Sequence, residues 1–395
     1  MNGASAPEGE PPAVSIEIIE DTEHLMGMRE EWNELLSESA SDCLFLTWEW
    51  LSTWWRHLSG DRKLLILTAR SRGRLVAIAP FVVRPPGISR VLPFPALEFL
   101  GTGSIGSDYL DVIIRRGYED SALEVLAESL AGMNRTVELE QIKIHGSIAG
   151  GIGKILEGRG WSVQEEETNL SRHINLSGQS WSSYVGSLGT AHRYNFSRRL
   201  RQLERGFALR FEKSDTEQER RPALGRLIAL HTARWRGYSR AFHTPNHLRF
   251  HEEITRLACE RGWLRFYTLW LDGEPVAALY GFRYGPVFNF YQSGFDPLYA
   301  RYSTGLVTMG LTIESALREG AEEFDLLQGV EQYKEHWARE VRPLGRLEFY
   351  PPRMRGLVYR RAAELSRAAR RMARKVLPKK IADRIATKCE IATRS

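Results

Sequence analysis

A polar turn with a single glycine joins an apolar strand to a helix at residues 293–305, in the segment "FNFYQSGFDPLYARYSTGLVTMG". Such turns bind phosphate in many enzymes, because the first N–H groups of a helix lack partners and the helix dipole is positive there. Ser303 or Thr304 can cap the helix, and Arg301 places a positive charge nearby. The N–H groups that we expect to face an anion are those of Thr304, Gly305 and Leu306.

The elements that must position this turn form a strand–helix–strand unit. Residues 287–292 and 324–327 are apolar strands, and the helix between them has one apolar face. A unit of this length is a right-handed crossover between parallel strands, and ligands bind beyond the carboxyl ends of such strands. The segment lacks the GxGxxG and GxxxxGK[ST] motifs, and many helices that begin with Ser or Thr and Gly bind nothing.

Two successive regions, residues 14–176 and 177–352, repeat one order of elements: helices, a hairpin or meander, a strand, a helix and a strand. This order predicts an α/β fold with a mixed (α+β) sheet in two tandem domains. A length of 395 residues also favours two domains. Residues 1–13, rich in Pro, Gly, Glu and Ser, are expected to form a disordered leader.

The composition is that of a soluble globular protein, with 43% hydrophobic and 26% charged residues. No apolar run is long enough to span a membrane, and the start of the chain lacks the features of a signal peptide. Cys43, Cys259 and Cys389 are too far apart to suggest a disulfide framework or a zinc cluster. We therefore expect a cytoplasmic protein without a bound metal.

Basic residues gather in two helical segments. Residues 353–395 carry 14 Lys and Arg and three acids, a net charge of +11 that leaves −6 for the rest of the chain. This basic amphipathic tail suits an anionic membrane surface, RNA or solvent alone. A helix at "HRYNFSRRLRQLERG" suits a nucleotide-sugar, a tRNA backbone, an acidic lipid or, again, solvent. Its arginines are Arg193, Arg198, Arg199, Arg201 and Arg205.

Several motifs resemble the CelD-like acyltransferases, tandem-GNAT proteins related to the Fem aminoacyltransferases. They are "YQSGFDP", "YSTG" before a helix, "FDLLQG" as a strand, "YKEHWA" shortly after it, and "LIALHTARWRGYSRAFHT" upstream. "WEWLSTWWRHL", "LVAIAPFVV" and "SDYLDVII" are similar to a degenerate first GNAT half. The resemblance spans roughly residues 14–350. It implies a degenerate GNAT-like domain over 14–176 and a GNAT acyltransferase domain over 177–352.

The resemblance also implies a donor. In GNAT folds the crossover holds the pyrophosphate of acyl-CoA, and the pantetheine lies between two diverging strands. Acetyl-CoA or another acyl-CoA is therefore expected at Gln292, Arg301, Ser303, Thr304, Gly305 and Leu306. The loop "ARYSTG" has fewer glycines and arginines than the usual GNAT loop. Fem-type relatives use aminoacyl-tRNA instead, and that donor is the alternative.

Acyl transfer needs a base, an oxyanion donor and an acid for the leaving group. Asp325, in the strand "FDLL", is a candidate base, or it binds the neighbouring loop. Lys334 matches a lysine of the Fem-like pattern that faces substrate, or it is solvated. Tyr291, at the strand end beside Gln292, is a candidate acid, or it packs as an ordinary strand residue.

Four residues are expected to contact the acceptor. His231, Arg234 and Trp235 lie one helical turn apart, with core packing as the alternative. Asp108 flanks Tyr109 in the first region and is expected to reach a cleft between the domains, unless it ends a strand or a turn.

These observations predict an acyltransferase that moves an acyl group from acyl-CoA to an amine or hydroxyl. The expected acceptor is a small molecule or a glycan precursor of the cell envelope. The protein is expected in the cytoplasm, with peripheral contact to the inner face of the membrane through the tail. No specific nucleic acid is expected unless tRNA is the donor. A catalytically silent scaffold in polysaccharide synthesis is the further alternative.

Overall fold

The computed structural model describes residues 14–86, 95–103, 106–235, 239, 241–329, 331–352, 356–362 and 364–365. The first half contains β1 (Val14–Ile19), α1 (Thr22–Gly27), α2 (Arg29–Ser37), η1 (Leu44–Leu46), α3 (Trp48–Leu58), β2 (Lys63–Ser71), β3 (Arg74–Arg84), β4 (Ala96–Phe99), β5 (Ile113–Ile114), α4 (Glu119–Met133), β6 (Thr136–Lys143), α5 (Ala149–Gly158) and β7 (Ser162–Asn175). The second half contains α6 (Trp181–Ser187), α7 (Thr190–Gly206), β8 (Leu209–Ser214), α8 (Glu217–Trp235), α9 (Pro245–Glu260), β9 (Leu264–Leu271), β10 (Glu274–Tyr284), β11 (Val287–Phe295), η3 (Pro297–Tyr302), α10 (Thr304–Arg318), β12 (Glu323–Gln328), α11 (Gln332–Trp337) and β13 (Glu340–Tyr350).

One mixed sheet runs through both halves, in the order β1-β2-β3-β4-β6-β13-β7-β12-β11-β10-β9-β8, with β5 against β3. The predicted α/β fold with a mixed sheet is confirmed. Strong turn sequences set the hairpins: Asp272 and Gly273, between β9 and β10, both have positive φ, as a tight hairpin turn requires. The predicted crossover is also present, because β11 and β12 pair in parallel with α10 between them.

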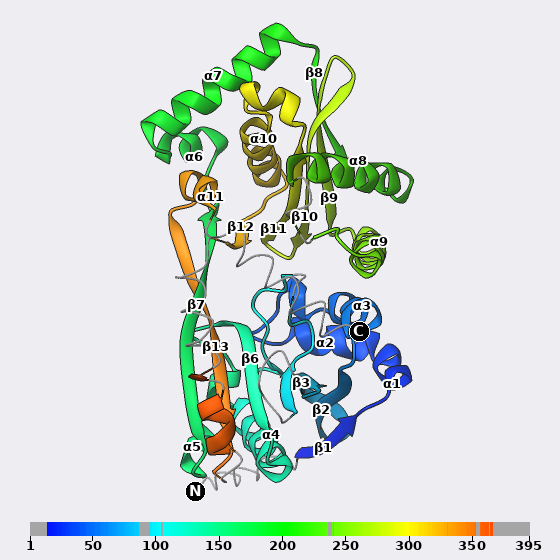
Figure 1. The fold of residues 1–395 in the computed structure, drawn as a ribbon, viewed down its shortest axis with the longest axis vertical. Helices are drawn as coiled ribbons and strands as arrows, with labels where there is room; N and C mark the ends of the chain where they lie inside the picture. The colour runs from blue at the N-terminus through cyan, green and yellow to red at the C-terminus, as the bar shows by residue number, and fades with distance from the viewer. Residues whose placement is uncertain are drawn as a thin grey trace, which may run out of the picture.

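Two long strands connect the halves along one side of the molecule (Figure 1). Most of β7, from Ser162 to His173, pairs with β13, and its end, from Ser171 to Asn175, pairs with β12. β13 in turn lies between β6 and β7. The last strand of the predicted second domain therefore completes the sheet of the first half. The division into residues 14–176 and 177–352 stays a prediction.

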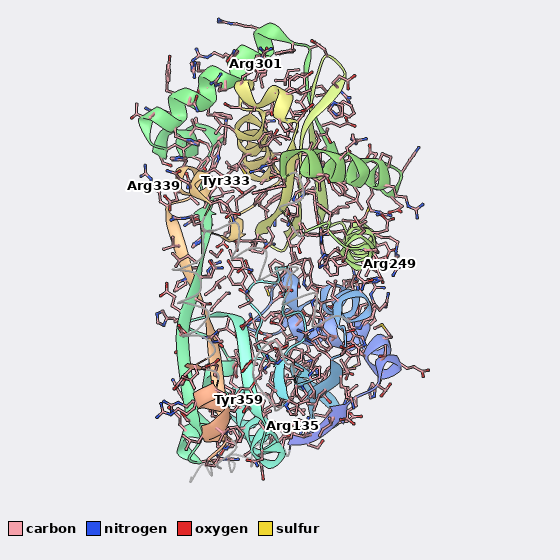
Figure 2. The ribbon with its side chains drawn as sticks, viewed as in Figure 1. Arg135, Arg249, Arg301, Tyr333, Arg339 and Tyr359 are labelled. Atoms are coloured by element: carbon pink, nitrogen blue, oxygen red, sulfur yellow. The ribbon has the colours of Figure 1, made fainter. Side chains whose placement is uncertain are left out.

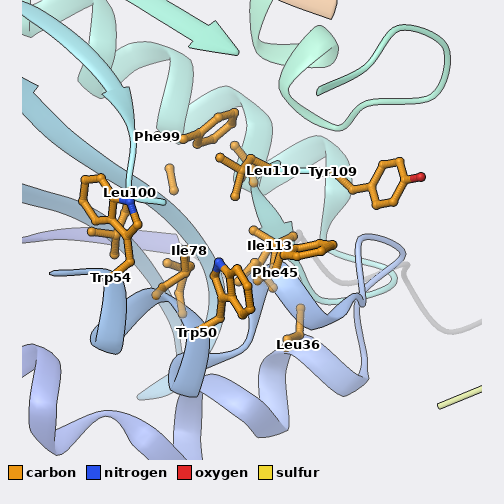
Figure 3. Packing of buried hydrophobic residues seen from close by; sticks show 14 of the residues in the cluster. Leu36, Phe45, Trp50, Trp54, Ile78, Phe99, Leu100, Tyr109, Leu110 and Ile113 are labelled. Carbon is orange, nitrogen blue, oxygen red and sulfur yellow. The ribbon is translucent and has the colours of Figure 1, made fainter. Parts of the chain in front are cut away.

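Trp50 of α3 links the two halves through the core. Figure 3 shows it among the buried side chains of the first half, near Phe45. Its ring also makes edge contacts with Phe250 of α9 and Tyr291 of β11, both at 5.3 Å between ring centroids. Trp50 is fully buried, and its Nε1 donates to Ser107 Oγ at 2.8 Å. The wall beneath β11 is thus built partly by the first half.

The described start of the tail, residues 356–362, is helical and packs against the first half. Tyr359 is buried beside Tyr350, and its hydroxyl accepts a hydrogen bond from Arg84 at 2.6 Å. The rest of the predicted basic tail and the predicted leader, residues 1–13, lie outside the described residues. Where the structure describes the chain, no helix is long and apolar enough to cross a bilayer.

Candidate active site

The parallel strands β11 and β12 separate partway along their length. They pair only at residues 287–289 and 323–325, and β11 continues to Phe295 on β10 alone. Beyond Asp325, Leu327 takes a φ of 57°, and Gln328 pairs with Ser171 of β7 after a shift in register. A left-handed φ at a leucine is strained. The kink at Leu327 thus turns β12 away from β11 and opens a gap.

α10 begins beside this gap and offers hydrogen-bond donors to it. Among the described residues, the N–H groups of Thr304 and Gly305 have no hydrogen-bond acceptor. Thr304 is only 1% exposed, and its Oγ1 atom is buried without a hydrogen-bond partner among the described residues. Unpaired donors at the positive end of a helix favour an anion.

Three details of the turn differ from what the sequence predicted. Ser303 adopts a left-handed conformation, with φ 57°, and its side chain does not cap α10. The N–H of Leu306 is not free, because it donates to the carbonyl of Ser303 at 3.0 Å. Arg301 is exposed and lies over the ring of Tyr302, at 4.7 Å from its centroid, rather than lining the cavity described next.

A cavity of about 560 Å³, which we call the outer cavity, lies in front of the α10 start. It extends from α10 to α7 and α11, and the middle of β10 and the end of β11 form its floor. Its lining is Ala191, His192, Asn195, Arg234, Ala278, Leu279, Ser293, Gly294, Phe295, Ala300, Ser303, Thr304, Gly305, Leu306, Thr308, Met309, Tyr333, His336 and Trp337. A mostly apolar pocket with a few polar groups is typical of a small-molecule site.

A smaller cavity of about 160 Å³, the inner cavity, fills the gap between β11 and β12. Both halves of the chain contribute to it. Its lining is Gly106, Asp108, Arg234, Trp235, Phe290, Tyr291, Gln292, Ser293, Leu326, Leu327, Gln328, Glu331, Tyr333 and Lys334. The structure thus brings together six of the residues selected from the sequence: Asp108, Arg234, Trp235, Tyr291, Gln292 and Lys334.

Three residues line both cavities and mark their junction: Arg234, Ser293 and Tyr333. Arg234 donates to Ser293 Oγ at 3.1 Å. Burial raises the pKa of Tyr333, so its phenol stays protonated near neutral pH and can donate a hydrogen bond. Tyr333 was not selected from the sequence, although it precedes Lys334 in the same short helix, α11 (Figure 2).

Asp108 is the strongest candidate for proton transfer. Burial raises the pKa of its carboxyl to about 7, the nearby charge of Asp325 acts in the same direction, and Lys334 opposes it. Its Oδ2 accepts the N–H of Gln328 at 2.7 Å, and its Oδ1 is buried without a partner among the described residues. A pKa near neutrality is what a general base requires. The sequence placed Asp108 in the cleft but did not indicate this role.

Lys334 lines the inner cavity while its ammonium is held by the kinked end of β12. It donates to the carbonyl of Gln328 at 2.7 Å and pairs with Glu331 at 3.2 Å. The side chain is 4% exposed. Gly329 makes room for this pair, because a Cβ there would lie 2.0 Å from Glu331 Oε2 and 2.6 Å from Lys334 Nζ. Lys334 therefore places a fixed positive charge beside Asp108.

Asp325, the base predicted from the sequence, lines neither cavity. Its Oδ1 accepts the N–H of Leu327 at 2.7 Å and the hydroxyl of Ser171 at 2.9 Å. Its Oδ2 accepts the hydroxyl of Tyr109 at 2.6 Å. These bonds hold the kink at Leu327, as in the loop-binding alternative. Asp325 therefore positions the strand rather than meeting a substrate.

The remaining predicted residues divide between the cavities and the core. Burial raises the pKa of Tyr291, the predicted acid, and the charge of Asp108 adds to this effect. His231 lines neither cavity: burial lowers its pKa to about 4, and Ser239 lies 3.2 Å from its Nε2. α8 passes so close to β11 here that a Cβ on Gly294 would lie 2.2 Å from the backbone nitrogen of His231. His231 therefore packs, whereas Arg234 and Trp235 reach the inner cavity.

Across the residues that the structure describes, no group of three or more His, Cys, Asp or Glu is arranged to hold a metal ion.

Comparison with known proteins shows which known domain this geometry resembles. Residues 190–335, from α7 to α11, match the family model described as an acetyltransferase (GNAT) domain. No curated protein matches the chain. A crystal structure of FemX is similar at 11% identity, covering 87% of this chain and 99% of that one, with a TM-score of 0.58.

Two further solved structures share the fold. A conserved protein of unknown function from Bacteroides thetaiotaomicron is 11% identical over 85% of this chain and 99% of its own, with a TM-score of 0.53. The C-terminal domain of a putative lysylphosphatidylglycerol synthetase from Agrobacterium fabrum is 12% identical over 86% of this chain and 94% of its own, with a TM-score of 0.52. At these identities the likeness concerns the fold.

The matched domain contains both the start of α10 and the gap between β11 and β12. Residues 190–335 therefore form a GNAT domain, and the protein is an acyltransferase.

Proposed function

We propose that the protein transfers an acyl group from a pantetheine thioester, such as acyl-CoA, to an amine or hydroxyl acceptor. The observation that carries this proposal is the junction of the two cavities at Arg234, Ser293 and Tyr333. The outer cavity takes the donor, with its phosphate at Thr304 and Gly305. The inner cavity takes the attacking group. The thioester then lies between them, in the gap between β11 and β12.

The side chains at the junction account for each proton. Asp108 takes the proton of the attacking amine or hydroxyl as the new bond forms. The sulfur leaves as a thiolate, and Tyr333 protonates it. The ammonium of Lys334 favours the ionised form of Asp108 between turnovers. Placing reactants between such groups in a site that excludes water supplies much of the acceleration in acyl transfer.

The acceptor that we propose is a glycan precursor of the cell envelope or a related metabolite, in line with the CelD-like motifs. An inner cavity of about 160 Å³ has room for the amine or hydroxyl that attacks and for the part of the acceptor next to it. A location at the inner face of the membrane, through the basic tail, belongs to the same proposal.

A second candidate is aminoacyl transfer from aminoacyl-tRNA. Two observations favour it: the fold shared with FemX and with a lysylphosphatidylglycerol synthetase domain, and the exposed arginines of α7. Both candidates use the same inner cavity and differ only in the donor.

The test is to incubate the protein with acetyl-CoA and a panel of amino sugars, nucleotide-sugars and polyamines. Mass spectrometry of the acceptors should show a gain of one acetyl group, and Lys334→Ala should lower the rate. If no acceptor gains mass while aminoacyl-tRNA is consumed, the second candidate replaces the first.

A further inference from the structure

The outer face of α7 carries a stripe of exposed side chains that begins with Tyr194, 63% exposed. Arg198, Arg201 and Arg205 follow at a spacing that keeps all of them on one side of the helix. Arg201 donates to the carbonyl of Ser197 at 3.1 Å. No acidic side chain in the described part of the chain forms an ion pair with these three arginines. They are available for an acidic partner.

One end of the stripe lies beside the mouth of the outer cavity. His192 and Asn195, on the same helix, line that cavity, and Arg198 Nη2 donates to Asn195 Oδ1 at 3.3 Å. The packing of α7 against the cavity is tight, because a Cβ on Gly310 of α10 would lie 2.2 Å from the ring of Phe196. The helix that carries the arginines is therefore held firmly against α10.

η3 forms the other side of the mouth. Phe207, directly after α7, packs against Tyr302 with 5.1 Å between ring centroids. Leu298 of η3 is 83% exposed and Arg301 is exposed, while Ala300 lines the cavity. Figure 2 shows Arg301 beside α7 at one end of the molecule. The mouth is thus surrounded by arginines and one projecting leucine.

The start of α10 offers few donors for a phosphate. Two N–H groups, of Thr304 and Gly305, and the buried, unpartnered hydroxyl of Thr304 are available, because the N–H of Leu306 already binds Ser303. Arg301 does not line the cavity. Three donors suit the single phosphate of a phosphopantetheine arm better than the pyrophosphate of a free nucleotide cofactor.

We propose that the donor is an acidic carrier protein that presents its thioester on a phosphopantetheine arm and docks on the α7 stripe and η3. This inference rests on the proposed function and names the partner of the same site. The arginines meet carboxylates on the carrier, and Leu298 meets an apolar side chain between them. The arm enters the outer cavity, and its phosphate reaches Thr304 and Gly305.

The transfer balances within this complex. The attacking nitrogen or oxygen forms a bond to the thioester carbon, and the carbon–sulfur bond breaks. The proton of the nucleophile goes to Asp108, and the sulfur of the arm takes a proton from Tyr333. The carrier leaves as its free thiol, and proton exchange with solvent restores Asp108 and Tyr333. No oxidant or further co-reactant is needed.

A small partner fits the stripe better than an RNA or a membrane. From Arg198 to Arg205 the stripe covers about 10 Å of helix, which is the contact length of one helix of a small protein. Glu204, exposed on α7, adds a negative charge beside it. A carrier can place a basic or polar residue opposite this charge, whereas a continuous phosphate backbone or lipid surface repels it.

The experiment compares three donors: an acyl carrier protein loaded with an acetyl group, acetyl-CoA and acetyl-pantetheine. The variant is Arg198→Glu/Arg201→Glu. The control is Arg135→Glu, which changes an exposed arginine near the opposite end of the molecule (Figure 2). The readout is the ratio of kcat/KM for the loaded carrier to kcat/KM for acetyl-pantetheine.

In the native protein the carrier should be the best of the three donors, and rising salt should weaken its use. The double variant should lower the ratio about tenfold or more, because charge reversal replaces attraction by repulsion, and Arg135→Glu should leave it unchanged. An unchanged ratio in the double variant, or a carrier no better than acetyl-CoA, overturns the inference and leaves the proposed function standing.

The inference is also overturned if the double variant loses binding to tRNA or to anionic vesicles but keeps the native ratio of kcat/KM for the loaded carrier to kcat/KM for acetyl-pantetheine. If none of the three thioesters is consumed by the native protein, the proposed function itself fails.

Discussion

Asp108 and Asp325 show how two buried aspartates close to one another take different roles. Asp325 has three hydrogen-bond donors on its two oxygens, from Leu327, Ser171 and Tyr109. Asp108 has one donor, from Gln328, and its second oxygen is unpartnered at the inner cavity. Burial raises the pKa of both carboxyls, and the hydrogen bonds on Asp325 oppose this effect from more partners than the single bond on Asp108 does. The less satisfied aspartate is the one suited to proton transfer.

Asp108→Asn should remove the base. With an acceptor that does not itself titrate near pH 7, kcat/KM of the native enzyme should rise with pH and level off above about 7, where Asp108 is ionised. The variant should lose this limb and about 10²- to 10⁴-fold in rate. An unchanged pH profile would remove Asp108 from the mechanism.

The same substitution should also change stability, with a sign fixed by linkage. The pKa of Asp108 in the folded protein, about 7, lies above the ordinary value of 3.8. The folded state therefore holds a proton that the unfolded chain releases as pH rises from about 4 to 7, and folding loses stability over that range. Asp108→Asn should be more stable than the native protein at pH 8 by up to about 4 kcal/mol, measured by urea unfolding. Equal stability at pH 8 would contradict the raised pKa.

Asp325→Asn is the matched comparison for a positioning role. It disturbs the bonds that hold the kink at Leu327, so it should lower stability by about 1–3 kcal/mol and reduce kcat. Its pH profile should keep the limb near pH 7, since that limb belongs to Asp108. Loss of the limb in Asp325→Asn would instead make Asp325 the base, as the sequence alone suggested.

The sequence predicted helices, strands and turns correctly where local residue patterns determine them. Apolar strands, the Asp272–Gly273 turn and the spacing of the α10 face follow from residue patterns, and the crossover they predicted is present. No local residue pattern predicts the kink at Leu327. Two of the side chains that bind Asp325 and hold the kink, those of Tyr109 and Ser171, come from far along the chain.

The site residues also divide into those that local sequence patterns predict and those that depend on contacts distant in the sequence. Arg234, Trp235 and Lys334 could be placed from motif and spacing, whereas Tyr333 at the junction could not. The raised pKa of Asp108 depends on burial between the halves, which no local pattern encodes. Arg301 has the charge that a phosphate site needs, but η3 directs it onto Tyr302.

Gly294 tests how closely α8 must approach β11. A Cβ at this position would lie 2.2 Å from His231 N and 2.5 Å from Leu230 C, both backbone atoms that cannot move without the helix. Gly294→Ala should therefore cost about 1–3 kcal/mol in the free energy of unfolding and displace Arg234 from Ser293. Gly305→Ala is the control, because its nearest contact would be a flexible ring edge at 3.3 Å. Equal thermal stability of the two variants would contradict the close approach.

At the scale of the whole molecule, the two halves are joined by strands rather than by a linker. β13 pairs with β6 and β7, and β12 pairs with the end of β7. Asp108 reaches the inner cavity from the first half, and Trp50 supports Tyr291 from below. The active site therefore depends on both halves, even though the matched domain covers residues 190–335.

A chain limited to residues 177–352 should not fold by itself. It keeps the start of α10 but leaves β13 and one edge of β12 unpaired, and exposed strand edges aggregate. Circular dichroism and size-exclusion chromatography should show an aggregated or largely unfolded fragment. A monomeric fragment with cooperative unfolding would show that the predicted domain division is an autonomous one.

The start of α10 as a phosphate site is tested most directly by calorimetric titration of acetyl-CoA into the native protein, Gly305→Ala and Gly305→Pro. We expect binding to the native protein and to Gly305→Ala, and binding about tenfold weaker or worse in Gly305→Pro, which lacks the N–H that faces the phosphate. Equal affinity in all three proteins, or no binding to the native one, would contradict a phosphate site at the start of α10.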